Sequence, residues 1–339
     1  MKRTAPYLKP TVKDVATCSG FSTATVSRVL NDDPKVSSRT RDAVRQCMEQ
    51  LGYRVNPIAR SLKTSRSNSI GIIAPEFQNE FFMAVAEGIE AYLRERGYIT
   101  FICNSRERVS EEVTLARKLV ENHVDGVILI PASGEGRITG HFDLLRQHHV
   151  PFVLVDRLVD GLSADAVLTD NYAGAFDAVE HCIREGAKKI GFIGGSDALT
   201  SARERFEGYR DAQKAHGIAM DDTLLRFGDM HIDSGYSLTA ELLREHEDLQ
   251  YLFIINLFMR IGAEKFLAEK EVGRDIRIVA FDESPVSSLF THSWITIRQP
   301  LEAIGSQAAE LILRRLDGLE TAAPLISRVP PGIIRHGVE

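Results

Sequence analysis

Cysteine is scarce in this sequence, and its spacing suggests no cross-linked or metal-bound framework. Four cysteines occur in 339 residues, at Cys18, Cys47, Cys103 and Cys182, and no two of them form a Cys-x-x-Cys pair. Zinc sites and disulfide frameworks use closer, patterned spacings, so we interpret each cysteine as a small buried apolar residue. The ten histidines contain no His-Glu-x-x-His motif. The sequence therefore predicts neither a metal site nor a cofactor.

Long apolar runs and catalytic motifs are also missing. No window approaches the run of about 20 apolar residues that crosses a bilayer, and the basic residues 1–10 precede no apolar stretch. We therefore expect no signal peptide, no membrane contact and a cytoplasmic location. The glycine-rich run 191–196 does not fit Gly-x-Gly-x-x-Gly, and no Walker lysine or Ser/His/Asp order stands out. An enzyme is consequently not expected.

Charge is present in ordinary amount but is unevenly distributed. The whole chain has a formal net charge of −6. Residues 1–66 contain 13 Lys/Arg and 5 Asp/Glu, a net charge of +8, which leaves −14 for the remainder. A basic segment joined to an acidic body is typical of a polyanion-binding module fused to another domain. The alternative is a basic tail that only favours solubility.

Three short amphipathic helices are predicted in the basic segment, each after a small polar capping residue. They are Val12–Ser19 after Thr11, Thr23–Leu30 after Ser22, and a helix from a Ser38 cap to Leu51. A tight turn at Gly20 separates the first two, which is the helix-turn-helix arrangement, whose second helix enters the DNA major groove. An inert three-helix bundle is the alternative, which the charge and the polar face around Arg28 disfavour.

The following segment, residues 56–63, predicts a helix of about two turns, too short to be stable alone in water. Asn56 can cap it, and Pro57 stands at its first position. Ile58 and Leu62 share one face of this helix. An apolar wedge with basic neighbours suits folding on a DNA minor groove, where it opens a base step.

From residue 69 onward, apolar runs alternate with amphipathic helical patterns. Seven runs read as strands buried on both faces: 69–74, 98–103, 126–130, 151–155, 189–194, 251–255 and 276–281. The repetition of strand and helix indicates doubly wound parallel sheets, and its length fits two sheets better than one.

Several motifs at fixed spacing make the chain resemble the lactose-repressor-type (LacI/GalR) family of bacterial transcriptional regulators. They are Thr-Val-Lys-Asp-Val-Ala from Thr11, Phe-Ser-Thr-Ala-Thr-Val-Ser-Arg-Val-Leu-Asn from Phe21, Val-Ser-Ser-Arg-Thr-Arg from Val36, Leu-Gly-Tyr from Leu51 and Asn-Pro with Ala-Arg-Ser-Leu up to Leu62. The resemblance implies that Thr23, Ala24 and Arg28 read bases. It implies phosphate contacts for Ser22, Thr25, Ser27, Asn31 and Thr40, and intercalation by Leu62.

The resemblance continues through Ile70-Gly-Ile-Ile-Ala-Pro, Val155-Asp-Arg, Arg205-Phe-Glu-Gly-Tyr, Ala280-Phe-Asp and Ile297-Arg-Gln-Pro. It implies a small all-α helix-turn-helix head and an α/β periplasmic-binding-protein-like core of two doubly wound parallel-sheet lobes. The expected domains are 1–55 (head), 56–68 (hinge helix and linker) and 69–339 (core). Within the core we expect an N-lobe of about 69–165 and 299–326 and a C-lobe of about 166–298 and 327–339. The implied chain crossings lie near Asp165, Arg298 and Ile326.

Polar residues at the predicted strand ends suggest a ligand site, because parallel sheets bind ligands at that edge. The resemblance carries effector contacts onto Asp156, Arg205, Asn256, Asp282 and Gln299. Carboxylates and amides of this kind pair with vicinal hydroxyls, which indicates a sugar. Each of these groups could instead be a solvated strand-end residue.

One departure from the family pattern suggests an acidic sugar. The family usually has Asn-Asp where this chain has Asn256-Leu257, and Arg260 follows in the first helical turn. Arg260 and Arg205, with Arg157 as a third guanidinium, could converge on a carboxylate at a helix N-terminus. The alternative is that Arg260 points to solvent or pairs with Glu264.

Together these features predict a ligand-responsive, sequence-specific repressor of carbohydrate or sugar-acid utilisation genes. Two heads are needed to read a palindromic double-stranded DNA operator, so a homodimer follows. A corepressor or a phosphoprotein partner could replace the inducer. A sugar-binding transport protein is the rival from another class, which the basic head and the missing signal peptide oppose.

Overall fold

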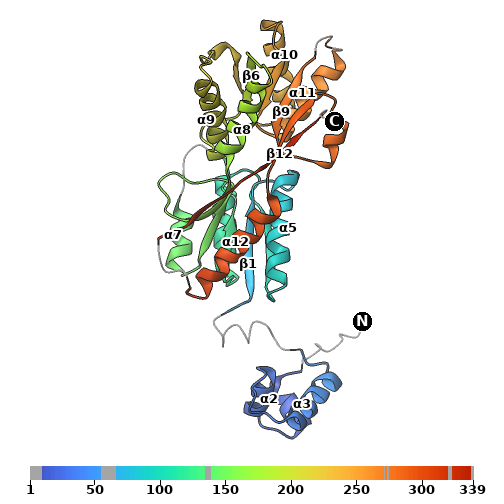
Figure 1. Ribbon diagram of the computed structural model, residues 1–339. Coiled ribbons are helices and arrows are strands. Elements are labelled where there is room, and N and C mark those ends of the chain that lie inside the picture. The colour runs from blue at the N-terminus through green and yellow to red at the C-terminus, as the bar shows by residue number, and fades with distance from the viewer. Residues whose placement is uncertain are drawn as a thin grey trace, which may run out of the picture. The chain divides into compact units, whose positions relative to one another are not determined.

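The computed structural model describes residues 10–54, 66–133, 139–270, 272, 275–319 and 323–336 (Figure 1). The chain divides into two units, Met1–Ser67 and Asn68–Glu339, which we call the head and the core. The predicted hinge helix, with Leu62, lies outside the described residues, so its role stays a prediction.

The head consists of the three expected helices, α1 (Val12–Ser19), α2 (Thr23–Leu30) and α3 (Ser38–Leu51). Local signals set their ends: Thr11 forms a capping box with Asp14, and Gly20 and Gly52 end α1 and α3 in the left-handed conformation. Ser37 caps α3, one residue before the predicted Ser38. The buried residues of the head form a small core of Val15, Ala16, Val26, Val29, Val44 and Cys47. The helix-turn-helix prediction is confirmed.

A disulfide joins α1 to α3, between Cys18 and Cys47, whose Cα atoms are 5.9 Å apart. The interpretation of these cysteines as small buried apolar residues was therefore wrong for Cys18, and for Cys47 it is confirmed only as to burial. Cys18 is exposed, and only Cys47 belongs to the core. Their separation of 29 residues in the sequence did not predict this disulfide, because the packing of α1 against α3 brings the two cysteines together. Cys103 and Cys182 are free thiols, of which Cys182 is buried as expected.

The N-lobe of the core is a six-stranded sheet in the order β11-β5-β4-β3-β1-β2, and neighbouring strands in it are parallel. Its strands are β1 (Ser69–Ala74), β2 (Ile99–Asn104), β3 (Gly126–Leu129), β4 (Phe152–Val155), β5 (Asp165–Thr169) and β11 (Ile326–Val329). Its helices are α5 (Glu80–Arg94), α6 (Val109–Glu121), α7 (Gly140–Gln147) and α12 (Leu301–Leu316). In Figure 1, α5 and α12 lie side by side next to β1.

The C-lobe repeats this arrangement in the order β12-β10-β9-β8-β6-β7. Its strands are β6 (Ile190–Gly194), β7 (Leu225–Phe227), β8 (Tyr251–Ile254), β9 (Arg277–Phe281), β10 (Ser293–Arg298) and β12 (Gly332–Arg335). Its helices are α8 (Asn171–Arg184), α9 (Thr200–Ala215), α10 (Ile232–Glu245) and α11 (Leu257–Glu269). Here the last strand, β12, is antiparallel to β10, whereas β11 is parallel to β5. The predicted two-lobed α/β core is confirmed.

Two of the three expected chain crossings lie a few residues further along the chain. All of β5 belongs to the N-lobe sheet, so the chain leaves that lobe after Thr169 rather than near Asp165. All of β11 also belongs to this sheet, so the last crossing follows Val329 rather than Ile326. The crossing near Arg298 is where it was expected, between β10 and α12.

The strands that the apolar pattern missed are the short or partly polar β5, β7, β10, β11 and β12. The pattern also misjudged β2, which was expected to be buried on both faces. This strand is at the sheet edge, and Ile99, Phe101 and Ile102 are 67%, 47% and 42% exposed. Across the described ranges, no helix combines the length and apolar character needed to span a bilayer.

Candidate functional site

The exposed side of α2 carries the residues predicted to read DNA bases. Thr23, Ala24 and Arg28 are exposed, whereas Val26 and Val29 on the opposite side are buried in the head. The residues face outward because the apolar stripe fixes which side of the helix packs on α1 and α3. This arrangement leaves a polar helix surface free to contact another molecule.

The predicted phosphate contacts surround this helix, and several of them also cap helices. Ser22 caps α2 by accepting a hydrogen bond from the Thr25 backbone N–H at 3.1 Å. Asn31 ends α2 and donates from Nδ2 to the Ser27 carbonyl at 2.8 Å. The Thr40 hydroxyl lies 2.9 Å from the Ser37 hydroxyl at the start of α3. The same polar groups therefore hold the head together and surround its exposed helix.

In the core, equivalent strands of the two lobes end in an aspartate. Asp156 follows β4 and Asp282 follows β9, and their φ angles are +67° and +74°. Left-handed backbone is unfavourable for residues other than glycine, and such strain concentrates at functional sites. The strand ends are also where open α/β sheets bind ligands.

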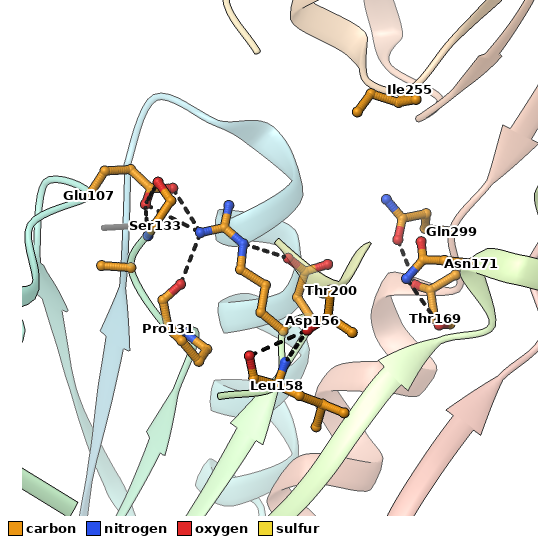
Figure 2. A network of polar contacts seen from close by, with 12 residues as sticks. Glu107, Pro131, Ser133, Asp156, Leu158, Thr169, Asn171, Thr200, Ile255 and Gln299 are labelled. Carbon is orange, nitrogen blue, oxygen red and sulfur yellow. Dashed lines mark hydrogen bonds and ion pairs between the residues drawn. The ribbon is translucent and has the colours of Figure 1, made fainter. Parts of the chain in front are cut away.

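Asp156 lies in a buried polar network on the N-lobe side (Figure 2). Its carboxylate is 3.3 Å from Arg157 Nε, and Arg157 Nη1 donates to Glu107 Oε1 at 3.0 Å and to the Pro131 carbonyl at 2.9 Å. Glu107 also accepts from the Ser133 backbone N–H at 2.6 Å. Burial raises the pKa of the Asp156 carboxyl, although Arg157 and Arg205 favour its ionised form.

Arg205, on α9, is a buried cation of the C-lobe. Its Nε donates to Asn171 Oδ1 at 2.8 Å, its Nη1 donates to the Ile255 carbonyl, and its guanidinium stacks 3.8 Å from the Phe281 ring centroid. Burial lowers the pKa of Arg205, and Asp282 and Asp156 oppose that shift. Such a buried, planar donor can bind carboxylates, carbonyls or hydroxyls.

Gln299 connects two of the chain crossings to Asp282. Its Oε1 accepts from the Thr169 hydroxyl at 2.6 Å, and its Nε2 donates to Asp282 Oδ1 at 2.5 Å. The other Asp282 oxygen accepts from the Leu257 backbone N–H at 3.2 Å. Figure 2 shows Gln299 and Thr169 on one side of Asp156, and Glu107 on the other. A ligand that replaced any of these bonds would act directly on the segments between the lobes.

Asn256 and Arg260, which were also predicted to contact the effector, are hydrogen-bonded to groups within the C-lobe. Asn256 caps α11, accepting from the Met259 backbone N–H at 3.0 Å, and donates to the Met230 carbonyl at 2.9 Å. Arg260 is fully buried, 3.2 Å from the Thr296 hydroxyl and 4.5 Å from the Phe290 ring centroid. Burial lowers its pKa to about 10.

The expected convergence of Arg157, Arg205 and Arg260 on one carboxylate stays a prediction; Arg205 and Arg260 both lie near Asp282, and Arg260 Nη1 is 3.5 Å from the Asp282 carbonyl oxygen. Each guanidinium contacts a different set of protein acceptors. Arg260 does not point to solvent, although Glu264 is close enough to favour its charge. The side chain lies between α11 and β10, because its position on the helix faces the C-lobe sheet.

Two cavities lie along the line where the lobes meet. One is lined by Asn79, Glu80, Phe81, Ala84, Leu257, Asp282, Glu283, Pro285, Arg298, Gln299 and Leu301. Beside it, the Ser284 hydroxyl donates across the lobes to Glu80 Oε2 at 2.6 Å. The other is lined in part by Ser133 and Arg157 of the N-lobe and Leu199 of the C-lobe. Within the described residues, no group of three His, Cys, Asp or Glu could hold a metal ion.

Sequence reasoning missed four of the polar residues in this region as site residues: Glu107, Thr169, Asn171 and Thr200. The Thr200 hydroxyl contacts the backbone of Leu158 across the lobes at 3.3 and 3.4 Å. Thr169 and Asn171 stand on either side of a chain crossing whose position was misjudged. An accurate end for β5 would have pointed to them.

Comparisons with known proteins agree with this architecture. The periplasmic binding protein domain matches residues 70–320, and the DNA-binding domain described as bacterial regulatory proteins, lacI family, matches residues 11–56. The ribose operon repressor of Halalkalibacterium halodurans is 31% identical over 309 residues, covering 91% of this chain and 90% of that protein. The HTH-type transcriptional regulator RegA of Clostridium saccharobutylicum is 33% identical, covering 92% and 94%.

Solved structures agree in fold over nearly the whole chain. A complex of the transcriptional regulator CelR with cellobiose has a TM-score of 0.71 at 28% identity, covering 96% of this chain and 98% of that one. A lac repressor dimer bound to operator and an anti-inducer has a TM-score of 0.83 at 24% identity, with the same coverage, and supports the fold. The chain therefore belongs to the lacI family of bacterial regulatory proteins.

Proposed function

We propose that this protein is a ligand-responsive, sequence-specific transcriptional repressor. The head binds an operator, and a sugar bound between the lobes of the core changes the affinity for that operator. The observation that carries this proposal is the pairing of two sites in one chain. One is the exposed polar face of α2, and the other is the pair of strained aspartates, Asp156 and Asp282, beside the buried Arg205. The ribose operon repressor and the CelR–cellobiose complex among its relatives support the assignment.

The proposed effector is a neutral sugar rather than a sugar acid. Two cations near the lobe junction already have a carboxylate nearby: Arg157 has Glu107 and Asp156, and Arg298 lies 3.1 Å from Glu283. The acidic-sugar expectation depended on Arg260, which contacts Thr296 inside the C-lobe. Paired carboxylates and amides without surplus positive charge suit hydroxyl groups.

The protein is proposed to act as a homodimer on a palindromic operator. The edge strands β2 and β7 hold the same place in their lobes, and both expose large apolar side chains. Phe101 on β2 is 47% exposed and Phe227 on β7 is 51% exposed. Exposed apolar edges of this kind are typical of protein–protein contacts. An isologous pair of cores would supply the two heads that a palindrome needs.

We propose no enzymatic activity, because the relatives are transcription regulators. The head disfavours the rival assignment as a transport protein. The second form of the same function is a repressor that is controlled by a corepressor or a phosphoprotein partner instead of an inducer.

The DNA-binding part is tested by selecting an operator from a randomised palindromic library and measuring affinity by fluorescence anisotropy. Arg28→Ala should lower affinity for the selected site by roughly 1–3 kcal/mol and weaken the preference at one base pair. Arg45→Ala is the matched control, since it removes the same charge from an exposed position on α3. If both variants lose affinity equally on selected and scrambled DNA, Arg28 is not a base reader.

The effector part is tested by thermal shift and calorimetry with sugars, each paired with its aldonic acid. D-ribose with D-ribonate and cellobiose with cellobionate are suitable pairs. A ligand at about 100 times its Kd adds roughly 2.7 kcal/mol of stability. We expect the neutral member of a pair to bind, and Arg260→Ala to leave its affinity within a factor of about 3. Binding of an acid alone would contradict the neutral class without affecting the assignment as a regulator, whereas failure to select any operator would contradict the regulator.

A further inference from the structure

The head contains a pair of cysteines placed for reversible oxidation. Cys18 is on α1 and Cys47 on α3, and their Cα separation of 5.9 Å is within the range that a disulfide spans without backbone movement. Cys18 is exposed, whereas Cys47 is 9% exposed and belongs to the apolar core. A reagent in solution can therefore reach one sulfur while the other stays behind it.

This asymmetry supports a definite reaction order. In the reduced pair, the Cys18 thiolate attacks a low-molecular-weight disulfide such as glutathione disulfide, forming a mixed disulfide and releasing one glutathione thiolate. Cys47, after losing its proton to solvent, attacks the Cys18 sulfur and releases the second glutathione. The two cysteines together lose two electrons and two protons, and glutathione disulfide gains them. Gln50 Oε1, 3.8 Å from Cys18 Sγ, is a ready acceptor for the Cys18 thiol after reduction.

The bridge matters because the apolar core in the described part of the head is small. Six buried residues form its core, and small cores contribute limited stability. The bridge closes a loop of 29 residues in sequence separation that includes all of α2. Cross-links over loops of this size restrict the unfolded chain, which stabilises the folded form.

We propose that Cys18 and Cys47 are a redox-modified dithiol site of the head. Its substrate is a low-molecular-weight disulfide, and its oxidised form is the one in which the DNA-binding helices are most stable. The inference goes beyond control by an effector, since the site lies in the head and needs no ligand in the core.

The experiment incubates the full chain in glutathione buffers of increasing oxidised fraction. Peptide mass spectrometry after alkylation measures the bridge, and hydrogen exchange measures opening of α1 and α3. We expect the Cys18–Cys47 bridge to form, and exchange in both helices to slow by roughly 30- to 500-fold relative to the reduced protein. As the bridge forms, the temperature at which the protein releases a random-sequence DNA duplex should also rise.

Two variants keep this test decisive. Cys18→Ser changes an exposed side chain and should behave like the reduced protein at every glutathione ratio. Cys103→Ser removes a free, half-buried thiol on β2 and should leave the response intact. The proposal is overturned if both cysteines stay alkylatable in the most oxidising buffer, if the bridge forms without slowing exchange, or if Cys103→Ser abolishes the response.

Discussion

The two lobes of the core share a strand order but surround their equivalent aspartates differently. Asp156 after β4 and Asp282 after β9 have the same left-handed backbone. Asp156 is 5% exposed beside Arg157, and burial raises its pKa. Asp282 is less buried and accepts hydrogen bonds from Gln299 and the Leu257 backbone. A repeated topology therefore repeats the position of a functional group, whereas the neighbours decide its chemistry.

Arg157 and Arg205 likewise share one contact but differ in their polar partners. Each guanidinium lies over a phenylalanine, Arg157 over Phe82 and Arg205 over Phe281. Arg157 lies between two carboxylates, whereas Arg205 donates to an amide oxygen and to the Ile255 carbonyl. The polar contacts of Arg157 are therefore mainly with carboxylates, whereas the hydrogen bonds of Arg205 are with neutral acceptors.

The largest expected difference between the lobes concerns the glycines between paired helices. A Cβ at Gly262 on α11 would lie 2.0 Å from the Ile232 carbonyl oxygen, so Gly262→Ala should destabilise the C-lobe by roughly 3 kcal/mol. At Gly88 on α5 the nearest atoms are 3.4 Å away, and alanine favours a helix by about 1 kcal/mol, so Gly88→Ala should be close to neutral. Urea denaturation measures both. Equal losses would show that Gly88 and Gly262 are equally close to the helices packed against them.

Removing the arginines should have the next largest effect. Arg205→Ala leaves the Asn171 and Ile255 oxygens buried without this donor, and should cost about 2 kcal/mol of stability and most of the effector affinity. Arg157→Ala leaves Glu107, whose side chain is 31% exposed and can take up water, and Asp156, whose pKa is raised so that it can take up a proton, so its cost in stability should be smaller. Denaturation and calorimetry on the two variants compare them. A larger stability loss for Arg157→Ala would reverse the ranking.

A smaller effect should appear in the pH dependence. Because the folded pKa of Asp156 is raised, the stability linked to its neutral form is lost as pH rises from about 4 through that pKa. Asp156→Asn should remove this loss, so that its stability relative to wild type improves from pH 4 to 7 while effector binding weakens. Denaturation across pH measures the difference. Asp282→Asn at the equivalent strand end is the control, and an identical change in both would refute the assignment to Asp156.

The smallest effect is expected at His336, which follows β12, the strand that is antiparallel to its neighbour β10. His336, after the antiparallel β12, has its pKa lowered by burial and by Arg260, with Glu283 opposing. The stability linked to neutral His336 is present above about pH 6.5 and is lost as pH falls through the folded pKa. His336→Gln should therefore flatten the stability profile of the chain between about pH 7 and 5. An unchanged profile would assign the dependence to other groups.

Local signals allowed most elements to be predicted. Caps at Thr11 and Ser22 and the glycine at Gly20 act within a few residues, so the helices of the head were placed correctly. Strand ends at Asp156 and Asp282 followed from the buried apolar runs of β4 and β9. By contrast, β11 and β12 are short and partly exposed, and their places depend on where the chain crosses between lobes.

The sequence by itself determined the helix-turn-helix head, the two α/β lobes and the strand-end position of the site, because these follow from short-range patterns of capping and burial. Only the tertiary structure decided what those residues touch. Arg260 is hydrogen-bonded to Thr296, Cys18 forms a disulfide with Cys47, and Gln299 is hydrogen-bonded to both Thr169 and Asp282. The residues in the pairs Arg260–Thr296, Cys18–Cys47 and Thr169–Gln299 are all at least 29 positions apart in the sequence. Such contacts depend on how whole elements pack, which no local spacing records.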